Sequence, residues 1–248
     1  QNARRAGAAC IEIHYDAATQ VLSVHDDGCG LEDFQKLLSF HESGWDAATA
    51  AEERPFGVGF SKCLYAATRC VVTSGGQRGD IDTEAALARA LITVEQVPAS
   101  EAINGTRVDL YAVDLPDLGT RVEELCLGFP VAVLFNGQPL KRPLAEGHLA
   151  TQASPIGAVH LAGTLDGKNS YETMVFLQGF CVLKPTYCLR DELNVVHLDS
   201  RQFMARLPDR DKLIDEDVQR KRIDAELKAC WRNTLEIART RLSPERFV

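Results

Sequence analysis

The sequence predicts an α+β protein of two domains, and three observations carry that prediction. Segments of alternating apolar residues and segments with helical spacing follow one another up to about residue 115, which is typical of a two-layer α/β sandwich with a largely antiparallel sheet. Leu115-Pro116-Asp117 then marks a boundary between domains. Beyond it, short strands precede one long amphipathic helix, which predicts a smaller α+β domain.

The first domain, residues 1–115, is expected to interleave strands and helices. Its opening residues, from Gln1, read as the middle of a helix, so we expect the chain to be a piece of a longer protein. Strands are expected at 10–15, 21–25, 70–74, 91–97 and 107–113, and helices over 31–40 and 60–67, with a mobile loop across 41–55. Gly75-Gly76 and Asn104-Gly105 are expected as turns between the later strands.

The second domain, residues 116–248, begins with a helix through about residue 127, which Asp117 is placed to cap. Strands are expected at 130–135, 159–161 and 174–183, with Asn136-Gly137 as a hairpin turn. A long helix is expected over 215–242. Its apolar stripe is expected to contain Val218, Ile223, Leu227, Trp231, Leu235 and Ile237.

Composition narrows the class of protein. The 248 residues are 45% hydrophobic and 25% charged, as in ordinary soluble globular chains. No apolar run approaches the roughly 20 residues of a membrane span, and no basic and then apolar leader opens the chain. With 27 Lys and Arg against 35 Asp and Glu, the formal charge is −8, which counts against general nucleic-acid binding but leaves a local basic groove open.

Cysteine and histidine spacing argues against a zinc site. The eight cysteines contain no C-x-x-C pair, and the six histidines form no ligand cluster. Several cysteines lie in apolar strings, where thiols act as small hydrophobic groups. We therefore expect reduced cysteines in a cytoplasmic protein.

Asp26-Asp27-Gly28-Cys29-Gly30 follows the second expected strand and has two interpretations. Asp-Gly pairs favour plain hairpin turns. Alternatively, a carboxylate at a strand end accepts a hydrogen bond from an exocyclic amine, and the glycines let a flat ring approach the backbone.

Gly57-Val58-Gly59-Phe60 precedes an expected helix, where free N–H groups suit a phosphate. It is equally compatible with an ordinary helix entry. Neither G-x-x-x-x-G-K-[ST] nor G-x-G-x-x-G occurs in the chain, so a phosphate site here is not a P-loop. Asn104-Gly105-Thr106 and Asn2, taken singly, are typical of a turn and of a surface helix residue.

In this order, the motifs resemble those of the GHKL (Bergerat-fold) ATPase superfamily, which includes heat-shock ATPase chaperones, MutL repair proteins, gyrase B-type topoisomerases and MORC proteins. The family pattern is an Asn-bearing helix, D-x-G-x-G after a strand, a mobile lid, a Gly-rich helix start and a late G-T. Residues 1–113 carry the resemblance, with the lid across about 31–56. The string at 56–60, Phe-Gly-Val-Gly-Phe, is most similar to the heat-shock branch. By position, residues 116–248 resemble the transducer domain.

The resemblance implies ATP and Mg²⁺ as ligands and gives each matching residue a role. Asn2 is expected to bind Mg²⁺, since an amide oxygen suits a hard cation. Asp26 is expected to recognise the adenine amino group, with Thr106 assisting through its hydroxyl or a water. The remaining expected contacts are Gly28 and Gly30 to the adenine edge, and Gly57, Val58, Gly59 and Phe60 to the phosphates.

One departure concerns catalysis. The family's general base is a Glu four residues before the Asn, and that position falls ahead of Gln1. We therefore expect slow ATP hydrolysis by the complete protein and nucleotide binding at best by this segment. Arg206, Arg210 and Lys212 are candidates for neutralising the terminal phosphate, against the plainer interpretation of a solvated charged loop.

The favoured function is an ATP-operated conformational switch resembling the heat-shock chaperones, with a homodimer and a protein client. The alternative is a MutL-, topoisomerase- or MORC-like ATPase that acts on nucleic acid. A sensor histidine kinase fits less well, because no histidine lies in a dimerising helix ahead of the ATP domain. A plain α/β binding module with accidental motif matches is the fourth hypothesis.

Overall fold

The computed structural model describes residues 1–38, 59–164, 168–169, 172–185, 193–206 and 210–243. The chain is of mixed α+β class, as the sequence predicts, and divides into two compact units. The first comprises residues 1–123 and 131–140, and the second comprises 124–130 and 141–248. No helix among the described residues is both long and apolar enough to span a membrane.

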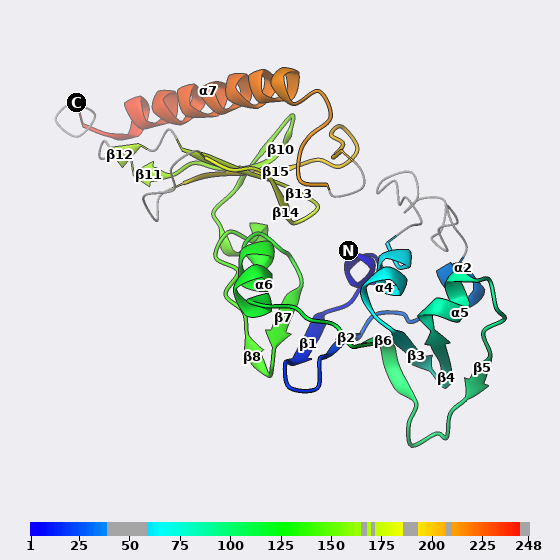
Figure 1. The fold of residues 1–248 in the computed structure, drawn as a ribbon. Coiled ribbons are helices and arrows are strands. Elements are labelled where there is room, and N and C mark those ends of the chain that lie inside the picture. The colour runs from blue at the N-terminus through cyan, green and yellow to red at the C-terminus, as the bar shows by residue number, and fades with distance from the viewer. Residues whose placement is uncertain (39–58, 165–167, 170–171, 186–192, 207–209, 244–248) are drawn as a thin grey trace. The chain divides into compact units, whose positions relative to one another are not determined.

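The first unit is built on an eight-stranded sheet in the order β5-β4-β3-β6-β2-β1-β7-β8. Every neighbouring pair is antiparallel except β1 and β7. Its short helices lie on one side of this sheet (Figure 1). Its elements are α1 (Asn2–Arg5), β1 (Cys10–Asp16), β2 (Val21–Asp26), α2 (Gln35–Leu38), α4 (Ser61–Ala66), β3 (Arg69–Gly75), β4 (Gln77–Asp82), α5 (Thr83–Leu87), β5 (Val94–Gln96), β6 (Ile103–Tyr111), β7 (Ala132–Phe135) and β8 (Gln138–Pro139), while α6 (Leu118–Cys126) runs from the first unit into the second.

Alternation along the strands buries one face of this sheet under the helices. Cys70 and Val72 on β3 are fully buried in a cluster that also contains Leu64 of α4. Phe34, just before α2, lies over the backbone of β4, where a Cβ added to Gly79 would be 3.3 Å from its ring. The helix-facing side of the sheet is therefore the core of the unit, as period-two alternation predicts.

The expected helix over 31–40 is wrong at its start, because the described helix, α2, begins only at Gln35. Leu31 is held instead by the side chain of Ser74, whose Oγ accepts from its N–H at 2.7 Å. Asp33 Oδ1 accepts from Gln35 N at 2.9 Å, an Asx turn that leads into the short helix. The expected loop at 41–55 lies outside the described residues.

Two elements between β3 and β5 escape the sequence analysis. Only Gly79 and Ile81 of strand β4 are buried, so the alternation of apolar residues is too weak to predict a strand from the sequence. Helix α5 is capped by Asp82, whose side chain accepts from Ala85 N at 2.9 Å. The strand expected at 91–97 is reduced to the three residues of β5.

Asn104-Gly105 lies inside β6 and is not the expected turn. Gly105 has φ +78°, and a Cβ added there would lie 1.8 Å from the carbonyl oxygen of Asp26 on β2. The glycine therefore permits a close approach of two neighbouring strands.

Strand β7 corrects the expected assignment of 130–135 to the second domain. It pairs in parallel with β1, with Cys10 opposite Ala132, and so extends the first sheet. The expected turn at Asn136-Gly137 is confirmed: it joins β7 to β8 with φ values of 47° and 75°, as a type I′ hairpin requires.

The second unit contains a five-stranded sheet in the order β14-β13-β15-β10-β9, with α7 running along it (Figure 1). The single strand expected at 174–183 is a hairpin, turned at Gln178-Gly179, where both φ values are positive. The elements of the second unit are η1 (Glu146–His148), β9 (Gln152–Ser154), β10 (Gly157–His160), β11 (Gly163–Thr164), β12 (Lys168–Asn169), β13 (Thr173–Leu177), β14 (Phe180–Leu183), β15 (Asn194–Leu198) and α7 (Glu216–Arg241).

The apolar stripe of α7 is narrower than expected. Ile223 and Leu227 are buried in the core of the second unit, as predicted. Val218, Leu235 and Ile237 are instead 65%, 48% and 44% exposed. Their apolar side chains were assigned to the buried face by spacing alone, but the sheet does not cover that part of the helix surface.

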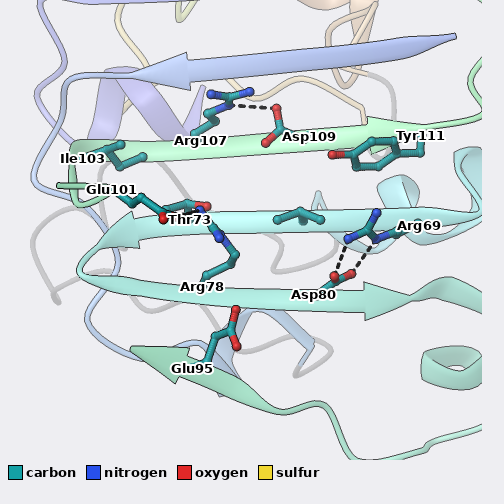
Figure 2. A pocket seen from close by; sticks show the side chains of 11 residues that line it. Arg69, Thr73, Arg78, Asp80, Glu95, Glu101, Ile103, Arg107, Asp109 and Tyr111 are labelled. Atoms are coloured by element: carbon teal, nitrogen blue, oxygen red, sulfur yellow. Dashed lines mark hydrogen bonds and ion pairs between the residues drawn. The ribbon is translucent and has the colours of Figure 1, made fainter. Parts of the chain in front are cut away.

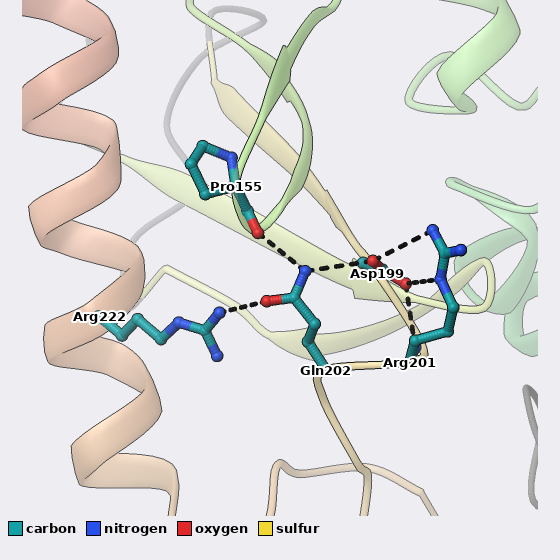
Figure 3. Close-up of polar contacts among 5 residues, drawn as sticks. All are labelled: Pro155, Asp199, Arg201, Gln202 and Arg222. Carbon is teal, nitrogen blue, oxygen red and sulfur yellow. Dashed lines mark hydrogen bonds and ion pairs between the residues drawn. The ribbon is translucent and has the colours of Figure 1, made fainter.

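A polar network ties α7 to the loops of its sheet (Figure 3). Arg222 of α7 donates to the side-chain oxygen of Gln202. Gln202 Nε2 donates to Pro155 O at 2.8 Å and to Asp199 Oδ2 at 3.2 Å. Hydrogen bonds from Arg201 lower the pKa of Asp199 to about 2.

We predict that Gly105→Ala destabilises the chain by about 2–4 kcal/mol, because both the left-handed φ and the carbonyl of Asp26 oppose a Cβ. Gly137→Ala is the matched control, since Gly137 has φ +75° but nothing within 4 Å of an added Cβ. It is expected to cost about 1–2 kcal/mol. Urea unfolding of both variants checks this, and equal losses would contradict the close approach.

His197 on β15 stacks on Phe176 with ring centroids 5.2 Å apart, and its Nε2 lies 2.8 Å from Leu144 O. Burial lowers the pKa of this imidazole below 6.5. The unfolded chain therefore binds the proton more readily, so the contribution of His197 to stability is present above about pH 6.5 and is lost as the pH falls.

We predict that wild-type stability decreases more than that of His197→Gln between about pH 7.5 and about pH 5.5. Urea unfolding of both proteins at each pH measures the difference. A parallel pH dependence in the two proteins would show that His197 does not titrate at a lowered pKa.

Candidate functional site

Three polar side chains form a row across neighbouring strands on the helix-facing side of the first sheet. Asp26, the last residue of β2, is directly opposite Thr106 of β6, and Thr106 is opposite Ser74 of β3. Directly opposed residues have their Cβ atoms about 5 Å apart. Ser74 shares its face of β3 with the buried residues Cys70 and Val72, so the row lies at the edge of the core.

Ser74 connects three segments of this site. Its hydroxyl accepts from Leu31 N at 2.7 Å, donates to Gly105 O at 2.8 Å and lies 3.2 Å from Thr106 Oγ1. The residue is only 3% exposed. The glycine-rich loop after β2 and the Gly-Thr pair of β6 are thereby held to the end of β3.

Gly28 and Gly30 lie in the loop that directly follows Asp26. Gly28 N donates to Asp26 Oδ1 at 3.0 Å, and Cys29 N donates to Ala6 O at 2.9 Å. A Cβ on Gly28 would lie 2.6 Å from the Ala6 Cβ, and Gly30 has φ +79°. Both positions therefore require glycine, in the first case for close approach and in the second for backbone conformation.

Asn2 lies on α1, the helix whose end contacts this loop. Ala6 N donates to Asn2 O at 2.8 Å, one turn along the helix. The exposed Asn2 side chain accepts from Arg5 Nη1 at 3.3 Å. Its amide oxygen is a suitable donor for a hard cation such as Mg²⁺. Across the described ranges, no group of three or more His, Cys, Asp or Glu side chains is placed to hold a metal.

The expected phosphate segment is only partly described. Gly57 and Val58 lie outside the described residues, whereas Gly59 and Phe60 immediately precede α4. Phe60 packs in part against the core cluster, and its carbonyl accepts from Cys63 N at 2.9 Å. No hydrogen bond within the described part of the chain joins Gly59 or Phe60 to Asp26.

The two neighbouring aspartates have different environments. Asp26 is half-buried, and that burial raises the pKa of its carboxyl, although the bond from Gly28 N opposes the shift. Asp27 Oδ1 accepts from Cys10 N at 2.9 Å and from Ala9 N at 2.7 Å, and these bonds lower the pKa of its carboxyl. Asp27 therefore anchors the start of β1, and Asp26 retains an oxygen, Oδ2, that no described residue binds.

Ser74 is the site residue that the sequence analysis missed. It ends an apolar strand and precedes Gly75-Gly76, so its hydroxyl reads as the start of a turn. The available signal was a pair of polar residues, Thr73 and Ser74, at the end of that apolar strand.

Arg206, Arg210 and Lys212 lie in the second unit. Arg206 pairs with Asp211 at 3.7 Å, and Arg210 Nη1 donates to Gln178 Oε1 at 2.8 Å. Lys212 is exposed, and its carbonyl accepts from Arg206 N. A role for any of the three at a phosphate stays a prediction.

A hollow of about 360 Å³ lies on the face of the first sheet opposite to the row of Asp26, Thr106 and Ser74 (Figure 2). It is lined by side chains of β3, β4, β5 and β6 that alternate with the core residues. Its cations lie in ion pairs: Arg69 with Asp80, Arg78 with Glu101 of the loop before β6, and Arg107 with Asp109. These pairs give the open face a mixed charge, which favours a solvated sheet surface over a phosphate site.

Comparison with solved structures shows that the fold is similar to that of an ATPase domain followed by a transducer domain. The ATPase and transducer domains of DNA topoisomerase II from Balamuthia mandrillaris match with a TM-score of 0.50 and 17% identity, over 73% of this chain and 57% of that one. The likeness is one of fold.

The ATPase region of Saccharomyces cerevisiae topoisomerase II matches with a TM-score of 0.48 and 13% identity, over 73% of this chain and 61% of that one. The chain thus spans less than two thirds of either matched structure. No family model and no curated protein matches the sequence.

We predict that Asp26→Asn does not destabilise the nucleotide-free chain and raises its melting temperature at neutral pH. The raised pKa means that folding disfavours the ionised carboxyl, whereas the asparagine oxygen still accepts from Gly28 N. Calorimetry at pH 7 checks this. A clear fall in melting temperature would show that the charge itself stabilises the fold.

Proposed function

We propose that the first unit binds ATP with Mg²⁺ and that the protein acts as an ATP-operated conformational switch. The observation that carries the proposal is the row of Asp26 and Thr106 beside two obligatory glycines, within the fold of an ATPase domain. Two hydrogen-bond acceptors side by side suit the amino group of adenine.

Base recognition follows from the hydrogen-bonding capacity of these residues. Asp26 Oδ1 is used by Gly28 N, so Oδ2 is the oxygen that would accept from the adenine amino group. Thr106, opposite it, would assist through its hydroxyl or a bridging water. Gly28 and Gly30 would let the ring edge approach the loop backbone.

The phosphates would be bound by the glycine-rich segment that precedes α4. Backbone N–H groups of Gly57, Val58, Gly59 and Phe60 are proposed to bind them, with Mg²⁺ on the side-chain oxygen of Asn2. When bound, Mg²⁺ supplies charge neutralisation between the phosphates.

Slow hydrolysis of ATP is proposed for the complete protein. Closure would accompany formation of a homodimer. We place the protein in the cytoplasm.

Two uses of the switch are proposed. The Phe-Gly-Val-Gly-Phe string at 56–60 favours a chaperone-like protein with a protein client. The similarity to the ATPase and transducer domains of a DNA topoisomerase II favours an ATPase that itself acts on nucleic acid. Retention of the complete protein on DNA only in the presence of nucleotide would select the second use, and client binding without DNA retention would select the first.

We predict that ATP with Mg²⁺ stabilises the full-length protein by about 2.7 kcal/mol at 100 times the dissociation constant. Asp26→Asn should abolish this gain, because the amide cannot replace the carboxylate as a charged acceptor. Glu12→Gln, which removes an exposed carboxylate from β1 of the same sheet, is the matched control. Thermal unfolding with and without ATP measures the effect, and an undiminished gain in Asp26→Asn would refute the proposed base site.

A further inference from the structure

The Ser74 hydroxyl has only one hydrogen to donate, and one of its neighbours can only accept it. A hydroxyl carries one hydrogen and two lone pairs. The N–H of Leu31 can only donate to Ser74 Oγ, and the carbonyl of Gly105 can only accept from it. The Ser74 hydrogen is therefore committed to Gly105 O, at 2.8 Å.

This commitment fixes the direction of the contact between Ser74 and Thr106. With the Ser74 hydrogen used, the 3.2 Å contact is made with Thr106 Oγ1 as the donor. The Thr106 hydroxyl then keeps only lone pairs for other partners. Asp26, directly opposite Thr106, is an acceptor as well. The exposed side of the row consequently presents acceptors alone.

We propose that Ser74 determines the base specificity of the site by holding the Thr106 hydroxyl as an acceptor. The inference rests on the proposed nucleotide binding and adds to it a preference between purine bases. A purine nucleotide with an exocyclic amino group is accepted, because an amine donates hydrogen bonds. A nucleotide with a carbonyl in that position is rejected, because two acceptors then face one another.

Loss of the Ser74 hydroxyl is expected to reduce this preference between bases. In Ser74→Ala the Thr106 hydrogen is released, and the hydroxyl can rotate to donate to a carbonyl on the ligand. We expect the preference for ATP over inosine triphosphate to fall by about tenfold. Ser74→Thr retains a hydroxyl at this position and should restore the preference.

A purely structural role for Ser74 gives a different result. Ser74 also ties Leu31 to Gly105, so its loss could loosen the whole site. That loosening would weaken the binding of both nucleotides by the same factor and leave the ratio of their dissociation constants unchanged. The ratio of dissociation constants therefore distinguishes a role of Ser74 in base specificity from a purely structural role.

The second arm of the test uses Thr106→Val, which removes the hydroxyl at nearly constant volume. In that background Ser74→Ala should no longer change the ratio, because the hydroxyl through which Ser74 acts is absent. An equal effect of Ser74→Ala in both backgrounds would overturn the proposal.

The experiment is calorimetric titration of the full-length protein and these variants with ATP and with inosine triphosphate, in the presence of Mg²⁺. Ser74→Cys, with a weaker donor of similar size, serves if Ser74→Ala does not fold, and should also lower the ratio. An unchanged ratio in a protein that binds ATP overturns the role of Ser74 and leaves the proposed function standing. Failure of the wild-type protein to bind either nucleotide overturns both.

Discussion

The close approach of β6 to β2 at Gly105 is the constraint on which the candidate site depends. A Cβ at this position would lie 1.8 Å from the carbonyl oxygen of Asp26, so only glycine lets the two backbones run this close. The approach leaves Asp26 and Thr106 in register across the strand pair. It also presents the Gly105 carbonyl to Ser74. The row of polar side chains is therefore a consequence of backbone packing at one residue.

Within that row, the polar groups divide into those satisfied by the fold and those left for another partner. Ser74 has its hydrogen and both lone pairs engaged, which is what a buried hydroxyl requires. One carboxylate oxygen of Asp26 accepts a hydrogen bond from Gly28 N, and burial raises the pKa of the carboxyl. Such a half-satisfied carboxyl opposes stability, which supports the proposed role of Asp26 in binding a ligand.

Residues with a strong local signature were predictable from the sequence, and residues defined by distant partners were not. Helix α7 and the hairpin turn at Asn136-Gly137 follow from apolar spacing and turn chemistry. Asp26 could be nominated because a carboxylate before two glycines is a local pattern. Ser74 could not, since its role exists only where the loop after β2 and strand β6 meet it. Strand β7 was assigned to the wrong domain for the same reason: its partner, β1, lies far away in the sequence.

The parallel pairing of β1 with β7 also affects the order in which the chain can fold. During synthesis, β1 leaves the ribosome at the beginning of this segment, whereas the strand that covers its edge follows about 120 residues later. Until then, one side of β1 has backbone groups without their native partners, and an open strand edge invites pairing with other chains. That edge of β1 therefore stays without its native partner until residue 135 has been synthesised.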